Sequence, residues 1–246
     1  MSRFFVTPDA VGDAAIRITD REDLHHMTKV LRLKPGDEIE VSDGTAWEYR
    51  GVLRLVTTEE SVADIVDKQA FAREPGIQIT LFQGMPKQGK MELIIQKAVE
   101  LGVSRVVPVF TDRSVVTDNG KMDKKIQRWQ KIADEAVKQC RRGKIPEIGE
   151  DLNFSQMAEQ LKDYDCVLFP YENEEDRSLK AGLRSLTEKP KNLAIIIGPE
   201  GGFSDREAAL LKEKGALCVT LGKTILRTET AGLAAIAMVL YELEMN

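Results

Sequence analysis

The chain has 246 residues, enough for two domains, and its 42% hydrophobic and 30% charged residues are typical of a globular protein. A net charge of −5 excludes a general basic coat for nucleic acid. Charge is uneven, however, because residues 121–144 hold nine Lys/Arg against three Asp/Glu. That segment could dock a polyanion or form a solvated helix face, and charge alone does not decide between them.

Cysteine usage and hydropathy favour a cytoplasmic protein. Cys140, Cys166 and Cys218 are odd in number and widely spaced, so they predict neither a disulfide framework nor a zinc site. The first ten residues lack the apolar segment of a secretory signal. The longest apolar stretch, residues 231–241, is too short to span a bilayer, so we expect no membrane contact.

The N-terminal region, residues 1–72, is predicted to be a small β-barrel. Short β-branched or alternating segments separated by turn residues indicate strands at 16–19, 38–42, 47–56 and 61–66. Between the first two strands, apolar residues at helical spacing predict a helix over 21–33. The region is acidic, with 14 Asp/Glu against 9 Lys/Arg, so any RNA contact there requires a local basic patch.

A linker is predicted at residues 70–76, and from there strands alternate with helices. The uninterrupted apolar strands indicate a mainly parallel sheet covered on both faces, so residues 73–246 form an α/β domain. The predicted strands are 77–83, 105–110, 166–169, 193–197 and 218–221. The predicted helices are 91–101, 123–140, 154–161, 178–186, 205–214 and 230–244.

Three loops that follow strands of this domain point to a ligand site. They begin at Pro170, Gly198 and Gly222, and glycine or proline turns at strand ends let backbone groups approach a flat ligand. The segment GPEGGFS (198–204) lacks the Gly-Lys-Ser/Thr of a phosphate-binding P-loop, and its Glu200 would repel phosphate. The first strand of the domain runs into QGMPK (83–87), which is no dinucleotide-binding glycine motif.

Motifs along the whole chain resemble the RsmE family of 16S ribosomal RNA (uracil-N3)-methyltransferases, within the SPOUT superfamily. The motifs are HMTKVLR (26–32), Gly36-Asp37, KMELIIQKAVELG (90–102), Arg113-Ser114, Arg128-Trp129, EAVKQ (135–139), IGPEGGFS (197–204), Leu221-Gly222 and ILRTETA (225–231).

This resemblance implies a PUA-like RNA-binding β-barrel (1–72) followed by a SPOUT methyltransferase domain (73–246). The second domain would carry a trefoil knot near its C-terminus. The resemblance also implies a homodimer and S-adenosylmethionine as the methyl donor. The expected substrate is N3 of uridine 1498 in 16S ribosomal RNA of the small ribosomal subunit.

The resemblance places the methyl donor in the three loops. Backbone groups would read the adenine, and Ile225 and Leu226 would cover its face, although any lone leucine is more often a core residue. The expected donor-binding residues are Leu168, Pro170, Gly198, Glu200, Gly201, Leu221, Gly222, Ile225, Leu226 and Thr230.

Methylation at N3 of uracil requires loss of the N3 proton, so a base or a cation that stabilises the anion would lower the barrier. Arg227 is the expected electrostatic residue, and Glu200 is the expected base or orienting residue. Glu200 could instead only complement the dipole of the following helix. One of Thr228 and Thr230 is expected to cap the last helix.

Basic side chains of both domains are candidates for RNA phosphate contacts. They are Arg3, His26, Lys29, Arg32, Lys87, Lys90, Arg113, Arg128, Lys138 and Arg142. The adjacent His25 and His26 lack a ligand pattern, so no metal is expected.

The last helix carries an apolar stripe that could be core, dimer interface or both. Two alternatives to the methyltransferase stay open at this point. One is a non-catalytic RNA-binding or ribosome-assembly module, and the other is a transferase acting on a small molecule.

Overall fold

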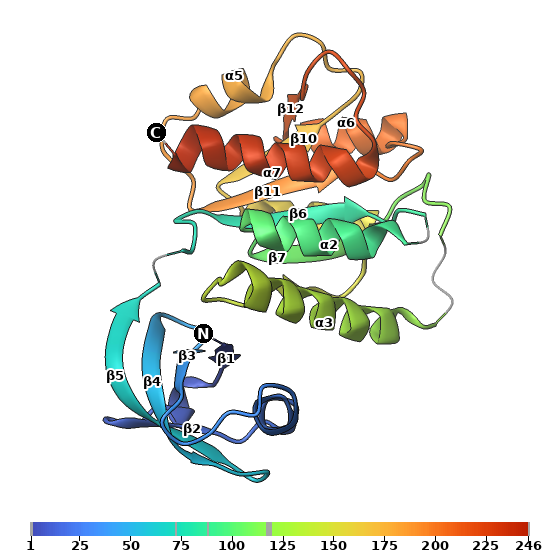
Figure 1. Cartoon of the computed structure of the whole chain (residues 1–246). Helices are drawn as coiled ribbons and strands as arrows, with labels where there is room; N and C mark the ends of the chain where they lie inside the picture. The colour runs from blue at the N-terminus through green and yellow to red at the C-terminus, as the bar shows by residue number, and fades with distance from the viewer. Residues whose placement is uncertain (1, 72, 88, 117–119, 246) are drawn as a thin grey trace. The chain divides into compact units, whose positions relative to one another are not determined.

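The computed structural model describes residues 2–71, 73–87, 89–116 and 120–245. The chain forms two compact units, one of residues 1–74 with 137–145 and one of 75–136 with 146–246 (Figure 1). Sequence patterns predicted a single boundary after residue 72, which itself lies outside the described residues. Across the described ranges, no helix combines the length and apolar character needed to cross a membrane.

The first unit contains a five-stranded sheet. Its strands are β1 (Arg3–Phe5), β2 (Ala15–Ile18), β3 (Glu38–Ser42), β4 (Trp47–Val56) and β5 (Ser61–Ala70). They pair in the order β1-β3-β4-β5-β2, with β1 parallel to β3 and the other pairs antiparallel. Alternating apolar residues such as Ile16, Ile18, Ile39 and Val41 enter one buried cluster, as the period of a strand requires.

The helical segment of the first unit is shorter than predicted. Helix α1 (Arg21–His25) begins at Asp20, whose side chain accepts the N–H of Asp23 at 2.9 Å, and it continues as one π-helical turn (His26–Val30). Arg32 then adopts a left-handed backbone with φ of 54°. A left-handed residue cannot continue an α-helix, so the predicted helix to residue 33 ends early.

Residues 137–145 belong with the first unit because polar groups on both segments pair. Glu74 binds the guanidinium of Arg142 at 2.8 Å and accepts the N–H of Gly143 at 2.8 Å. The Ser42 hydroxyl donates to the carbonyl of Gly143 at 2.5 Å. Helix α3 (Met122–Cys140) therefore contributes its last residues to this unit, and the domain boundary predicted from sequence omits them.

The second unit contains a parallel sheet, as predicted. Its strands are β6 (Gln78–Gly84), β7 (Arg105–Phe110), β8 (Glu147–Ile148), β9 (Leu152–Asn153), β10 (Cys166–Pro170), β11 (Asn192–Ile197) and β12 (Leu217–Val219). The order is β12-β10-β11-β6-β7-β8, with β9 also on β7, and every pair is parallel.

Helices cover this sheet on two sides. They are α2 (Lys90–Leu101), α3, α4 (Phe154–Gln160), α5 (Leu179–Arg184), α6 (Asp205–Glu213) and α7 (Thr228–Glu244). In Figure 1, α2 and α7 lie in front of the sheet and α6 lies behind it. All predicted helices and strands of this unit are present, with ends shifted by one or two residues, whereas β8 and β9 were not predicted.

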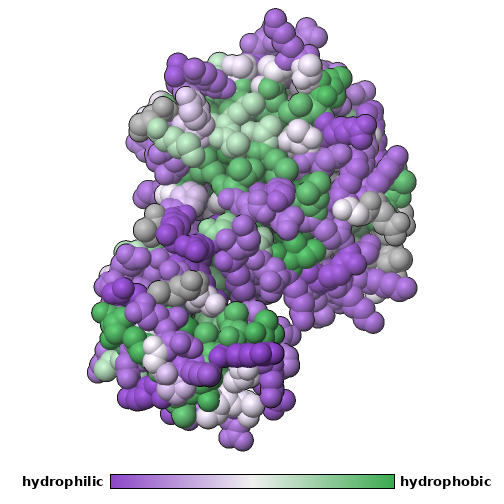
Figure 2. All heavy atoms as spheres, viewed as in Figure 1, coloured by the Kyte–Doolittle hydropathy of each residue, from purple (hydrophilic) through white to green (hydrophobic). Residues whose placement is uncertain are grey.

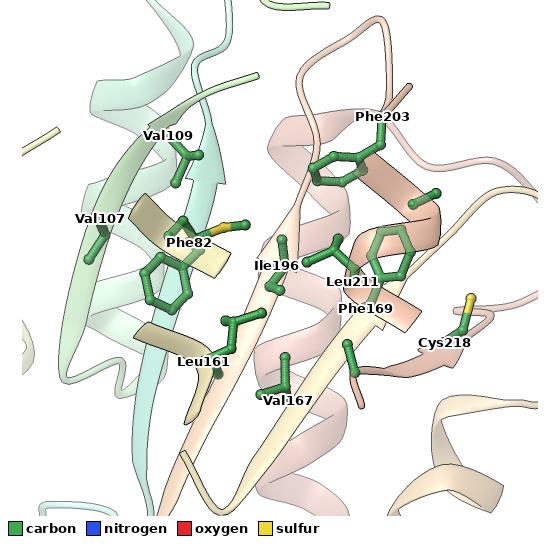
Figure 3. Close-up of a cluster of buried hydrophobic side chains, with 14 residues drawn as sticks. Phe82, Val107, Val109, Leu161, Val167, Phe169, Ile196, Phe203, Leu211 and Cys218 are labelled. Atoms are coloured by element: carbon green, nitrogen blue, oxygen red, sulfur yellow. The ribbon is translucent and has the colours of Figure 1, made fainter. Parts of the chain in front are cut away.

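Side-chain alternation along β6 decides which residues reach which face. Phe82 enters the core cluster that also holds Phe169 and Phe203 (Figure 3). The next residue, Gln83, points to the opposite face, towards α7. There Gly232 of α7 faces it, and a Cβ on Gly232 would lie in van der Waals contact with Gln83 Oε1, at 3.6 Å. The first turns of α7 therefore pack directly against the end of β6.

Candidate active site

Five neighbouring strands of the second unit end at one edge of the sheet. Since β12, β10, β11, β6 and β7 are all parallel, their carboxyl ends share that edge, where ligands of open parallel sheets bind. The sequence pointed to three loops there, after β10, β11 and β12. The structure adds the loops after β6 and β7, which contact the loop after β11.

The loop after β11, residues 198–204, is called the glycine loop below. The N–H of Gly202 bonds to the Pro199 carbonyl at 3.0 Å, and Gly202 has a φ of 67°, a conformation that glycine adopts without strain. A Cβ on Gly84, at the end of β6, would lie 2.6 Å from Pro199. Any side chain at residue 84 would therefore push the glycine loop away from β6.

The loop after β7 also holds the glycine loop. The backbone N–H of Asp112 donates to Glu207 at 2.9 Å, and the hydroxyl of Ser204 donates to the Asp112 carboxylate at 2.7 Å. Ser204 and Glu207 in turn form a capping box that begins α6. Arg113 donates to the carbonyl of Gly201 at 3.2 Å. The glycine loop is thus fixed at both ends.

A buried chain of hydrogen bonds joins β6, α7 and the glycine loop. The Gln83 amide donates to the Thr228 hydroxyl at 2.8 Å, and that hydroxyl donates to the Gly198 carbonyl at 2.6 Å. We call this the neutral link. It corrects the capping prediction, because the N-cap of α7 is Arg227, without a side-chain cap. The Thr228 hydroxyl serves the glycine loop instead.

A second connection, the ionic link, lies beside the neutral link and is partly exposed. Lys90 Nζ, on the first residue of α2, is 2.8 Å from Glu200 Oε1 in the glycine loop and 2.9 Å from Glu229 Oε2 in the first turn of α7. Glu200 also accepts the backbone N–H of Lys87 with both carboxylate oxygens, each at 3.2 Å.

These contacts shift the pKa values of all three ionised groups. Partial burial alone would raise the pKa of Glu200, but hydrogen bonds from Lys90 and from backbone N–H groups outweigh it and lower that pKa. The Lys90 hydrogen bond lowers the pKa of Glu229. The pKa of Lys90 rises because hydrogen bonding with Glu200 and Glu229, together with their negative charges, stabilises its protonated form. The carboxylates are therefore held ionised and are weak bases.

The remaining predicted donor-binding residues lie along the same edge. Leu168 is fully buried within β10 as a core residue, and Pro170 ends that strand. Strand β12 ends at Val219, before the predicted residue 221, so Leu221 and Gly222 belong to the loop. Ile225 in this loop is 82% exposed. Leu226 is partly buried, whereas Gly201 and Thr230 are exposed.

Arg227 stands between this loop and α7. Its side chain is exposed, and its carbonyl accepts the N–H groups of Thr230 and Ala231, both at 2.8 Å. Glu229, two residues later, carries the ionic link. The first turn of α7 therefore places an exposed guanidinium next to a fixed carboxylate.

Two basic residues predicted to bind RNA are buried and bound to other groups. Arg3 is 7% exposed and donates to Glu48 at 3.0 Å and to the Arg142 carbonyl at 2.8 Å, so it is a structural cation of the first unit. Arg142 is 5% exposed and pairs with Glu74. The prediction that Arg3 and Arg142 bind RNA is therefore wrong, because a phosphate could not reach either buried guanidinium group.

Other predicted RNA contacts remain on the surface. His26, Lys29 and Arg32 are exposed on or just after the π-helical turn. Lys87 and Arg113 are exposed at the strand edge of the second unit. Two more form ion pairs, Arg128 with Glu92 and Lys138 with Asp23. Within the described ranges, no group of three or more His, Cys, Asp and Glu is arranged to hold a metal.

Sequence reasoning did not identify Gln83, Asp112 or Glu207 as site residues. A signal existed for Gln83, because it is a polar residue that follows the apolar run Leu81-Phe82 at the end of the strand, directly before a glycine. Such a residue at the carboxyl end of a parallel strand is positioned for a site. Asp112 and Glu207 offered no pattern, since their contact joins segments 95 residues apart.

Comparison with known proteins agrees with this arrangement. Residues 73–240 match a family model described as RNA methyltransferase domain, and residues 18–57 match the RNA methyltransferase PUA domain. Ribosomal RNA small subunit methyltransferase E of Bacillus subtilis (strain 168) is 33% identical over 100% of this chain and 98% of its own length. The protein of that name from Synechocystis is 29% identical over 96% of this chain and 76% of its own.

A solved structure gives the same result for the fold. The ribosomal RNA small subunit methyltransferase E from Neisseria gonorrhoeae, bound to S-adenosyl methionine, superposes with a TM-score of 0.85 at 29% identity, covering 98% of this chain and 97% of that one. These matches confirm the resemblance seen in the motifs, and with it a PUA domain followed by a parallel α/β methyltransferase domain. The chain belongs to the ribosomal RNA small subunit methyltransferase E family.

Proposed function

We propose that the chain methylates N3 of uridine 1498 in 16S ribosomal RNA of the small subunit, using S-adenosylmethionine. Membership of the family supports ribosomal RNA methylation with this donor. One observation carries the proposal for the site. The glycine loop, the end of β6 and the first turn of α7 are joined at a single sheet edge by two independent links.

The residues at this edge fit the methyl donor. Gly222 has a φ of 138°, and a Cβ built on it would enter open space with no atom within 4 Å. A side chain there would fill space that a ligand could use, which suits a glycine at a binding loop. The exposed Ile225 offers an apolar surface for an adenine face. We assign donor binding to the ten residues named from the motifs. Among them, the fully buried Leu168 would support the site by packing beneath it.

When bound, S-adenosylmethionine supplies an electrophilic methyl group on a positively charged sulfur. The chain must then help uracil to lose its N3 proton, since the neutral ring nitrogen is a poor nucleophile. We assign Arg227 to stabilise negative charge on a uracil oxygen, because its guanidinium is exposed at the start of α7. Preorganised cations of this kind lower barriers where charge develops.

We assign Glu200 an orienting role instead of a role as general base. Lys90 and the Lys87 N–H hold its carboxylate ionised, and its pKa is lowered. A base with a depressed pKa has little driving force to take the N3 proton of uracil. Glu200 therefore fixes the glycine loop at the donor site.

RNA contacts are assigned to exposed cations only. On the first unit these are His26, Lys29 and Arg32, and on the second unit Lys87 and Arg113. Arg128 and Lys138 are secondary candidates, because a phosphate would have to compete with Glu92 and Asp23 for them. If several of these cations contact phosphates together, the affinity for RNA should fall steeply as the salt concentration rises.

The proposal includes a homodimer, a C-terminal trefoil knot and a cytoplasmic location, where ribosomal subunits are assembled. Tyr241 and Met238 on α7 are 64% and 40% exposed, and Figure 2 shows hydrophobic surface over that helix, which suits a subunit interface. The knot is proposed from the resemblance of the motifs to the SPOUT superfamily. Light scattering at micromolar concentration tests the dimer.

The decisive experiment maps 16S ribosomal RNA by mass spectrometry from cells with and without the protein, and after treating the undermethylated small subunits with purified protein and donor. We expect one added methyl group, on uridine 1498. Methylation at another position, or none, would refute the assignment. Free nucleosides that were methylated without RNA would favour a small-molecule transferase.

Arg227→Met tests the catalytic assignment. We expect kcat for the subunit substrate to fall by about a hundredfold or more, the usual loss for one electrostatic group. Lys223→Met, in the same loop, is the matched control and should retain activity. Equal activity of the two variants would remove Arg227 from the mechanism.

A further inference from the structure

We propose that Lys90 is a positioning residue of the active site, which joins Glu200 to Glu229, instead of the RNA phosphate contact that its charge suggests. This inference rests on the methyltransferase function proposed above. It concerns how the donor site is held together.

The geometry of Lys90 supports this role. The side chains of Lys90, Glu200 and Glu229 are 27%, 23% and 18% exposed, so the cluster is partly shielded from water. The ammonium nitrogen lies 2.8 Å from Glu200 Oε1 and 2.9 Å from Glu229 Oε2, so it forms an ion pair with each carboxylate. The two carboxylates together more than neutralise the lysine, so the cluster does not attract a phosphate.

The two carboxylates belong to the segments that surround the proposed site. Glu200 lies in the glycine loop, and Glu229 lies two residues after Arg227. Without the ammonium, two negative groups would face each other and repel. We infer that the exposed side chains at the start of α7, Arg227 among them, would then shift relative to the glycine loop, while the Thr228 hydroxyl keeps the helix itself in place. Lys90 thus acts on the reaction through the position of Arg227 and of the donor-binding loop.

The neutral link makes this inference testable in a folded protein. Gln83 and Thr228 are buried, Gly198 is partly buried, and their hydrogen bonds do not involve Lys90. Replacing Lys90 should therefore leave α7 docked on the sheet. Its effect is then a displacement of exposed groups by the repelling carboxylates, and not unfolding of the unit.

The experiment compares Lys90→Met, Lys90→Arg and the matched control Lys97→Met, which removes another lysine of α2 that pairs with Glu100. For Lys90→Met we expect donor affinity, measured by titration calorimetry, and kcat each to fall by about tenfold. Lys90→Arg should recover most of both, and Lys97→Met should match the wild type. The salt dependence of RNA binding should be unchanged in all three.

A phosphate contact would behave differently. It would lower the slope of log affinity against log salt by about one and leave donor affinity intact, and that result would overturn the proposal. Unchanged donor affinity and kcat would also overturn it. If the wild type itself bound no donor, the failure would belong to the proposed function and not to Lys90.

A double-variant cycle provides a second measurement. If Lys90 acts through Glu229, then Glu229→Gln should reproduce part of the loss, and Lys90→Met with Glu229→Gln should lose less than the sum of the single losses. Strictly additive losses would mean that the two side chains act separately, against the proposal.

Discussion

Arg3 and Lys90 are both cations bound by two carboxylates, yet their surroundings give them different roles. The Arg3 side chain is only 4% exposed, lies between Glu40 and Glu48, and also donates to two backbone carbonyls. The Lys90 side chain is 27% exposed, and its partners come from the glycine loop and from the first turn of α7. Arg3 is therefore an internal part of the PUA unit, whereas Lys90 lies at the surface of the methyltransferase unit.

This difference shows that the number of ion pairs is a poor guide to what they do. A buried pair that loses one partner leaves an uncompensated charge without water, which destabilises the fold strongly. A partly exposed pair is screened by solvent and contributes little to stability. The sequence suggested RNA binding for Arg3 and Lys90 alike, and burial separates them from each other and from the truly exposed cations.

The largest expected effect comes from removing the buried cation. Arg3→Met should lower the free energy of unfolding of the first unit by about 3–5 kcal/mol, because Glu48 and two carbonyls lose their donor. Urea denaturation followed by fluorescence measures this change. Arg17→Met, which breaks an exposed pair with Glu60, is the control and should cost no more than about 1 kcal/mol. Similar losses in both variants would contradict the role of burial.

An intermediate effect is expected for the neutral link. Thr228→Val removes a buried hydroxyl that accepts from Gln83 and donates to Gly198, so stability should fall by about 1–3 kcal/mol. Thr224→Val, in the exposed loop before α7, should change stability by less than about 0.5 kcal/mol. Thermal unfolding compares the two. A neutral outcome for Thr228→Val would mean that the link does not hold α7.

The smallest expected effect is a pH dependence of the ionic link. The folded-state pKa values of Glu200 and Glu229 lie below the ordinary value of 4.5, so their contribution to stability is complete above that pH and is lost as pH falls through the lowered pKa values. The stability difference between wild type and Lys90→Met should therefore shrink below about pH 4.5. Chemical denaturation between pH 7 and pH 3 measures it, and a constant difference would contradict the ion pairs.

The two units also differ in how much of their structure could be predicted from sequence. The main strands of the methyltransferase unit are apolar runs, so their positions and a mainly parallel sheet could be predicted, whereas the order of the strands was not. Strands β1, β8 and β9 have two or three residues, too short for any period to be visible. The helix predicted to residue 33 ended early because Arg32 adopts a left-handed backbone that its residue type does not announce.

The site residues also fall into those that could be predicted from sequence and those that could not. The glycine loop and the loop before α7 were recognisable because their motifs are continuous in sequence. The roles of Gln83 and Thr228 were not, because their hydrogen bond joins residues 145 positions apart. Likewise, nothing near Arg3 in sequence indicates that carbonyls 138 and 139 positions later are its partners. Such pairings depend on tertiary structure alone.

The inclusion of residues 137–145 in the first unit has a consequence for biosynthesis. The nascent N-terminal segment emerges from the ribosome before the carbonyls of Arg141 and Arg142, which Arg3 binds, have been translated. Domains commonly fold in the order of synthesis, but this one must wait for a stretch that interrupts the next domain. A fragment that stopped at residue 74 would leave Arg3 short of acceptors and Glu74 without Arg142.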